Sequence, residues 1–129
     1  MSTVNQLTRI PRLKKYRRSK SPALLKSPFK AGVCTKVYTV NPKKPNSAIR
    51  RIAKVLLSTG KSILCYIPGI NNPGIQKYSR VLIRGGRRRD LPGIKYQLLK
   101  GKLDFSYREG EFERQQRRSK FGIPRGFYR

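Results

Sequence analysis

The fold is decided by residues 33–57, which read VCTKVYTV (33–40), NPKKPNSA (41–48) and RRIAKVLL (50–57). The first piece is rich in β-branched residues and lies between Gly32 and Pro42, which is typical of a strand. In the third piece Ala53, Val55 and Leu57 fall on one face, as the two-residue period of a strand requires. The sequence therefore predicts two strands joined by a polar, proline-rich loop.

Three further segments have the pattern of strands, namely Ser62–Ile67, Tyr78–Arg84 and Ile94–Lys100. Alternation assigns their inward faces to Ile63, Cys65, Ile67, Val81, Ile83, Ile94, Tyr96 and Leu98. Arg80 and Arg84 then face outward. Five short strands joined by turns rich in Gly and Pro predict a mainly β fold, a small closed five-stranded barrel of the OB-fold type. No part of this region has the pattern of an amphipathic helix.

The composition divides the chain into three parts. These are a basic N-terminal extension (1–32), the barrel (33–100) with loops at 41–48 and 84–93, and a basic C-terminal tail (101–129). A helical turn is predicted at Thr3–Arg9, with Thr3 as its cap. Apolar residues among the cations suit segments that become ordered between RNA helices. The tail also carries aromatic rings that can stack on bases: Phe112, Phe121, Phe127 and Tyr128. The alternative interpretations are disordered, solvated tails or, for the extension, a nuclear localisation signal.

The charge of the chain is strongly one-sided. The 129 residues carry a formal charge of +27, and residues 1–89 contain 22 Lys and Arg but no Asp or Glu. A dense polyanion is expected to supply the missing negative charge, and nucleic acid fits because displaced counterions drive binding to phosphates. No membrane partner is expected, since no apolar run approaches the roughly 18 residues of a spanning helix. General RNA binding is assigned to Arg9, Arg12, Lys14, Lys15, Arg17, Arg18, Lys20, Arg50, Arg51, Arg117, Arg118 and Lys120.

Catalysis, a metal and a cofactor are not expected. The chain has two cysteines and no histidine, which are too few ligands for a zinc site. Cys34 and Cys65 are interpreted as reduced core thiols, which suit a reducing compartment. No pair of carboxylates is positioned for acid–base chemistry, and neither thiol has a recognisable activating base. The N-terminus lacks an apolar signal region, so secretion is not expected.

The loop at 41–48 combines stiffness with polar side chains. Pro42 and Pro45 fix their own φ angles and restrict the residues before them, so Lys43 and Lys44 are held on a stiff support that suits phosphate contacts. Asn46 and Ser47 carry both donors and acceptors. Short groups of this kind can reach the shallow minor groove of helical RNA and its 2′-hydroxyls. A polar β-turn explains the loop alone equally well.

The loop at 84–93 reads RGGRRRDLPG. Gly85 and Gly86 permit a tight turn, and three consecutive arginines follow. A hairpin with a solvated charged tip is the alternative interpretation, and a P-loop is excluded because the GK[ST] ending is missing. Asp90 is the first acid of the chain and is surrounded by arginines. It is expected to order the loop by pairing with arginine rather than to act in catalysis.

Five motifs stand out along the chain: TVNQL (3–7), GVCTKVY (32–38), PKKPNSA (42–48), VLIRGGR (81–87) and RSKFG (118–122). In the order and spacing of these motifs the chain closely resembles the universal small-subunit ribosomal protein S-twelve family, of the bacterial and organellar type. The resemblance extends from residue 2 to about residue 123. The two loop motifs together make the resemblance highly specific.

The resemblance implies an OB-type barrel whose two loops lie beside the decoding helix of small-subunit rRNA. The chain would be a structural constituent of that subunit, in contact with rRNA and other ribosomal proteins, near the mRNA–tRNA helix, and not a homo-oligomer. It would support accurate codon–anticodon recognition. By match of motif, the contacts at the decoding centre are Lys43, Lys44, Pro45, Asn46, Ser47, Arg87, Arg88, Arg89, Asp90 and Pro92.

The sequence departs from the family pattern in several places. Residues 68–78 lack the family's histidine-containing stretch, Arg89 stands where lysine is common, and the segments 108–113 and 126–129 diverge. Divergence around preserved loops favours an organelle, and a resemblance that begins at residue 2 leaves no room for a transit peptide. A mitochondrial ribosome and an organelle-encoded protein are therefore expected, with plastid and bacterial cytoplasm as alternatives.

A free OB-fold single-strand RNA-binding protein or RNA chaperone is the alternative function. It accounts for the charge and the strands, but not for two rigid loops that match one family. A chaperone would be released from small subunits by a high-salt wash, whereas a ribosomal protein would remain bound.

Overall fold

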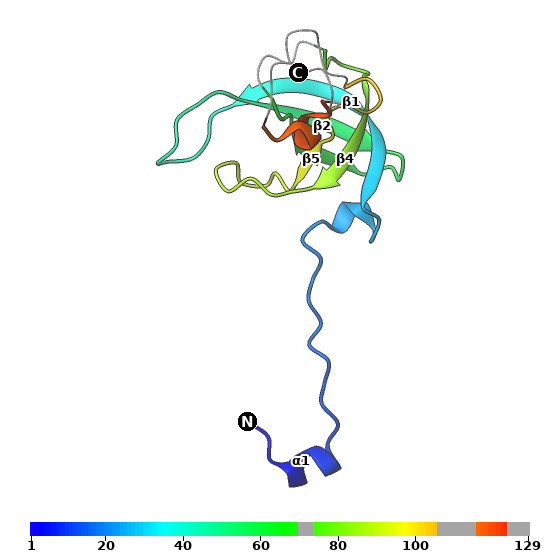
Figure 1. Cartoon of the computed structure of the whole chain (residues 1–129), viewed down its shortest axis with the longest axis vertical. Coiled ribbons are helices and arrows are strands. Elements are labelled where there is room, and N and C mark those ends of the chain that lie inside the picture. Colours follow the sequence, from blue (N-terminus) through cyan, green and yellow to red (C-terminus); the bar gives the residue numbers. More distant parts are fainter. Residues whose placement is uncertain (70–73, 106–115, 124–129) are drawn as a thin grey trace.

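The strands close into a barrel in the computed structural model, which describes residues 1–69, 74–105 and 116–123. They are β1 (Phe29–Val40), β2 (Arg50–Leu57), β3 (Ser62–Tyr66), β4 (Arg80–Gly85) and β5 (Tyr96–Leu98). The order around the barrel is β1-β2-β3-β5-β4 (Figure 1). Only the β3–β5 pair is parallel among these strand pairs. The mainly β class and the closed five-stranded barrel of OB type are confirmed.

The first strand is longer than its local pattern indicates. β1 begins at Phe29 rather than at Val33, because Phe29–Val33 pairs with β4 before the rest of the strand pairs with β2. Gly32 lies where both neighbours meet, opposite Leu57 of β2 and Val81 of β4. The last strand is shorter than predicted, since β5 covers only Tyr96–Leu98.

The predicted inward faces form most of the barrel core. Ala53, Val55, Val81 and Ile83 have no exposed surface, and the other assigned residues are buried except the partly buried Ile63. The assignment of Ile94 to the inward face is wrong, because Ile94 is buried in a separate cluster with Ile52, Tyr66 and Leu91. Arg80 is exposed and Arg84 is half-buried, as alternation requires. Gln97 is also buried, although its position in the strand predicts an outward side chain.

Both cysteines lie in this core as free, buried thiols, as predicted. Burial raises the pKa of Cys34 to about 11, with a smaller contribution from the negative charge of Asp104. Burial also raises the pKa of Cys65 well above its ordinary range. Thiols held protonated in this way are poor nucleophiles.

A second apolar cluster lies on the outer side of β2 and β3. Ile52 and Tyr66 face each other across these strands and pack with Leu91 and Ile94. Their neighbours Ala53 and Cys65 point into the barrel, so Ile52 and Tyr66 point away from it. The β4–β5 connection is thereby folded over the outer face of β2 and β3.

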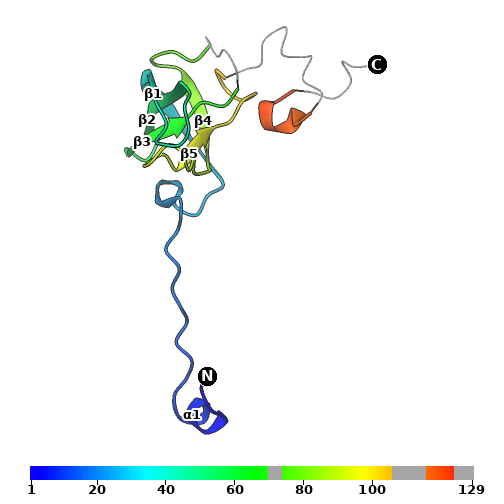
Figure 2. The same ribbon diagram turned by 90° about the vertical axis from the view of Figure 1, so that its left-hand side faces the viewer.

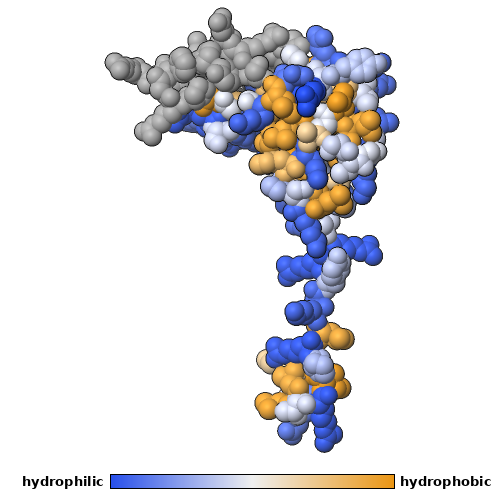
Figure 3. Space-filling view, turned by 90° about the vertical axis from the view of Figure 1, so that its right-hand side faces the viewer, coloured by the Kyte–Doolittle hydropathy of each residue, from blue (hydrophilic) through white to orange (hydrophobic). Residues whose placement is uncertain are grey.

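The N-terminal arm extends away from the barrel (Figures 1 and 2). It begins with α1 (Val4–Arg9), where Thr3 and Gln6 form a capping box, so the predicted helical turn is confirmed. Apolar side chains lie among hydrophilic ones along the arm (Figure 3), and Val4, Ile10 and Leu13 are between 69% and 91% exposed. In the described residues, no helix is both long enough and apolar enough to cross a membrane.

Three core residues come from the two end segments, since Ala23, Leu24 and Phe105 pack in the same cluster as the inward residues of the strands. A 3-10 turn, η1 (Pro22–Leu24), buries Ala23 and Leu24, and the amide of Ala23 donates to the Tyr96 hydroxyl at 2.9 Å. On the other side, η3 (Arg118–Phe121) buries Phe121. The prediction that Phe121 stacks on RNA bases is therefore wrong, because its ring is only 8% exposed. Phe112, Phe127, Tyr128 and the divergent segments 108–113 and 126–129 lie outside the described residues.

Candidate nucleic-acid interface

The two polar loops project from the same side of the barrel (Figure 1). One connects β1 to β2 and the other connects β4 to β5. In OB folds these two connections, with the outer face of strands 2 and 3, form the usual surface for oligonucleotides. The strand order alone thus brings together two motifs that are separated by about forty residues of sequence.

Asp90 joins the two loops to each other and to the barrel. Its backbone carbonyl accepts a hydrogen bond from the amide of Lys43 at 3.0 Å. Its carboxylate Oδ2 lies 3.1 Å from Nη2 of Arg50, in an ion pair whose side chains are 14% and 35% exposed respectively. The expected pairing of Asp90 with arginine is confirmed. The partner lies at the start of β2, however, and not within the arginine run.

The arginine loop is fixed further by contacts with the barrel. The guanidinium carbon of Arg88 lies 3.9 Å from the centre of the Tyr66 ring, a cation–π contact. The amides of Gly86 and Arg88 donate to the carbonyls of Lys95 and Ile94, which continues the β4–β5 pairing into the loop. The sequence did not identify Tyr66 as part of the site, although alternation with Cys65 on the inward face puts Tyr66 on the outer face.

The glycines of this loop act differently from the prediction. The positive φ angle belongs to Gly93, at 83°, and neither Gly85 nor Gly86 has one. A side chain at Gly86 would instead meet Gln97, since its Cβ would lie 3.1 Å from Nε2. Gln97 in turn accepts a hydrogen bond from Nη2 of Arg84 at 2.9 Å. Gly86 therefore leaves room for a buried amide rather than for a tight turn.

The outer surface of both loops is polar and cationic. Its exposed residues are Lys43, Lys44, Pro45, Asn46, Ser47, Arg87, Arg89 and Pro92. The amide of Asn46 donates to the carbonyl of Lys43 at 3.2 Å, which closes a turn around the cis peptide bond between Lys44 and Pro45. Arg88 and Asp90 are half-buried beneath this surface. Eight of the ten predicted contact residues are thus exposed on the two loops, and the other two are half-buried.

The cations assigned to general RNA binding fall into separate groups. Those of the arm are all exposed: Arg9, Arg12, Lys14, Lys15, Arg17, Arg18 and Lys20. Arg117, which precedes η3, and Lys120, within it, are exposed, and Arg118 is half-buried. Arg50 differs from all of these, because its guanidinium is engaged by Asp90.

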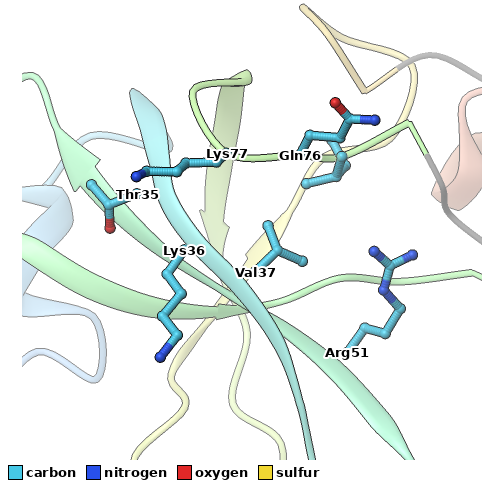
Figure 4. Close-up of a pocket in the computed structure, with 7 residues that line it drawn as sticks. Thr35, Lys36, Val37, Arg51, Gln76 and Lys77 are labelled. Atoms are coloured by element: carbon cyan, nitrogen blue, oxygen red, sulfur yellow. The ribbon is translucent and has the colours of Figure 1, made fainter.

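Arg51 lies in a separate cavity of about 560 Å³ along β1, with Thr35, Val37, Gln76 and Lys77. Figure 4 shows Arg51 and Val37 extending towards Gln76, whereas Lys36 points away from them. The Lys36 ammonium lies instead 5.3 Å from the centre of the Tyr38 ring. Successive side chains of a strand point in opposite directions, so Arg50 faces Asp90 of the arginine loop and Arg51 faces the cavity along β1.

Within the described ranges, no three His, Cys, Asp or Glu residues are grouped as metal ligands. The site consists of cations, amides, hydroxyls and prolines on two joined loops, which can bind phosphates and the polar edges of RNA. The sequence model of one protein family, Ribosomal protein S12/S23, matches residues 17–124. The match includes both loops, all five strands and the last part of the arm.

Proposed function

The chain belongs to the Ribosomal protein S12/S23 family, and on this premise we propose that it binds small-subunit rRNA at the decoding centre. As a member of the family it is a structural constituent of the small ribosomal subunit, acts in translation, and belongs to a non-enzymatic class of proteins. The proposal adds that its two loops lie against the rRNA that inspects the codon–anticodon helix, and that they support accurate decoding.

The observation that carries this proposal is the connection made by Asp90. Through the Lys43 amide and the Arg50 guanidinium it turns two loops into one surface. Decoding compares a closed with an open arrangement of RNA, and discrimination requires contacts that differ between the two. A rigid surface can favour the closed arrangement alone, whereas flexible loops would adapt to both. The exposed Lys43 and Lys44 supply the phosphate contacts, and Asn46 and Ser47 the contacts with the minor groove.

We further propose that the ribosome is mitochondrial. The support is the pattern of divergence, which affects residues 68–78 and 108–113, whereas the two loop motifs depart from the family pattern only at Arg89. Purification of ribosomes from separated cell fractions, followed by mass spectrometry of this chain, distinguishes mitochondrial from plastid or bacterial origin.

Replacement of Asn46 by alanine tests the proposed function. The variant loses the side-chain hydrogen bonds to RNA, each worth about 0.5–1.5 kcal/mol, and the closed arrangement becomes less favourable. Near-cognate tRNA binds more weakly than cognate tRNA, so its acceptance depends more on the stability of the closed arrangement. We therefore expect misreading to fall by about 2- to 10-fold. Misreading is measured by near-cognate incorporation in translation with purified ribosomes.

The matched control is Asn41→Ala, the same chemical change at the base of the same loop. Ribosomes with this variant are expected to decode like the wild type. An error frequency unchanged by Asn46→Ala, in ribosomes confirmed by mass spectrometry to contain the variant, contradicts the proposal.

A further inference from the structure

The outer face of β2 and β3 is covered by the chain itself. In an OB fold this face is part of the usual surface for single-stranded nucleic acid, where bases stack on aromatic rings. Tyr66 of β3 supplies a ring on this face, where it lies opposite Ile52 of β2. Tyr66 is only 9% exposed, however, so its ring is not open to a base.

Two kinds of contact cover Tyr66, and both come from the β4–β5 connection. Leu91 and Ile94 pack with it in one apolar cluster. Arg88 lies over the ring, with its guanidinium carbon 3.9 Å from the ring centre. Because a guanidinium is planar and stacks on aromatic faces, it takes the position over the ring that a stacked base would need.

Arg88 is placed differently from the arginines beside it. Arg87 and Arg89 are exposed, whereas Arg88 is half-buried. Its amide donates to the carbonyl of Ile94 at 3.2 Å, and its Nε is buried with no hydrogen-bond partner among the described residues. A guanidinium that binds phosphate uses its N–H groups as a fork, but this one packs against the Tyr66 ring.

We propose that Arg88 is a specificity-determining residue, which occupies the stacking position on Tyr66 and so excludes single-stranded RNA from this ring. The role differs from the RNA contact that the motif implies for Arg88. It goes beyond the proposed function, because it concerns the RNA that the barrel face excludes and not the RNA that the loop tips bind. The barrel thus keeps the strands of a single-strand-binding fold while its own loop fills the stacking site.

Binding of a single strand to the purified full-length chain tests this role through the sign of the effect. We expect Arg88→Ala to bind a labelled oligouridylate of about eight nucleotides roughly 5- to 20-fold more tightly than the wild type, because a base can then stack on Tyr66. The loss of a cation alone predicts the opposite, a weakening of about 2- to 5-fold. Fluorescence anisotropy measures the dissociation constant. The gain should persist at higher salt, since stacking releases no counterions.

The matched control is Arg89→Ala, the same change at the neighbouring exposed arginine. This variant is expected to bind the oligouridylate more weakly than the wild type. A second pair of variants identifies the ring as the source of the gain. The gain from Arg88→Ala should remain in combination with Tyr66→Phe, which keeps the aromatic face, and should disappear in combination with Tyr66→Leu, which removes it.

Two results overturn the inference. One is binding by Arg88→Ala that is equal to that of the wild type or weaker. The other is a gain that persists in combination with Tyr66→Leu, which would assign it to a part of the chain other than the ring. Neither result affects the proposed function, which is tested by misreading in ribosomes that contain Asn46→Ala. Unchanged misreading there would refute the decoding role and leave the role of Arg88 as proposed.

Discussion

Replacement of Gly32 by valine is expected to keep the chain out of the small subunit. A Cβ at this position would lie 2.7 Å from the carbonyl oxygen of Leu56 and 2.7 Å from Cγ1 of Val55. The carbonyl belongs to the β2 backbone and cannot turn aside as a flexible side chain could. Since Gly32 pairs with both β2 and β4, relief of this clash would separate β1 from a neighbour and open the barrel.

The expected loss is large compared with the stability of a small domain. Overpacking by added methylenes that can be accommodated costs about 1–3 kcal/mol of stability. A valine that clashes with fixed backbone is expected to cost at least the upper value of this range. Small domains have total stabilities of about 5–15 kcal/mol. Quantitative mass spectrometry of small subunits from cells that also express the wild-type chain measures incorporation.

Gly74→Val is the control for this substitution. A Cβ at Gly74 has no neighbour within 4 Å, so incorporation is expected to match the wild type. Incorporation of Gly32→Val at the level of Gly74→Val would show that the barrel does not close as described.

Small subunits that contain Asp90→Asn are expected to have the strongest decoding phenotype of any single loop variant proposed here. The amide cannot form the ion pair with Arg50, so the β4–β5 loop loses its charged contact with β2 and keeps only the apolar packing on Ile52 and the backbone hydrogen bond from Lys43. Hydrogen bonds to charged groups contribute about 1.5–3 kcal/mol, and the partial exposure of Arg50 favours the lower end. We therefore expect misreading to fall by roughly tenfold, with slower acceptance of cognate tRNA as well.

The control is Asp104→Asn, the same change at a carboxylate that accepts a hydrogen bond from the Arg80 amide, away from the loops. Its error frequency is expected to be that of the wild type. A double-mutant cycle with Arg50→Ala isolates the ion pair, because Asp90→Asn should add little once Arg50 is absent. Equal error frequencies for Asp90→Asn and Asp104→Asn would show that the ion pair between Asp90 and Arg50 does not contribute to decoding.

Much of the barrel could be predicted from the sequence because its signals are local. A period of two placed Val81 and Ile83 inside, and prolines and glycines marked the connections. The loops could be recognised as motifs for the same reason, because all their residues are contiguous.

Features that depend on distant contacts could not be predicted. The hydrogen bond from Ala23 to Tyr96 joins residues 73 positions apart, and nothing near Ala23 indicates it. The same applies to Arg50 as the partner of Asp90, and to Phe121, which is buried in a segment that reads as a solvated tail. Gly85 and Gly86 have the pattern of a turn, but Gly86 serves close packing against Gln97, eleven residues further along the chain.

Site-specific crosslinking from the 41–48 loop in intact small subunits is the most direct measurement of the central claim. With a photoreactive residue at Ser47, the account predicts a crosslink to the rRNA that contacts the codon–anticodon helix. A probe at Arg89 in the other loop should reach the same RNA. Crosslinks from both positions to protein alone, or to rRNA remote from the codon, would contradict the claim that these two joined loops form part of the decoding centre.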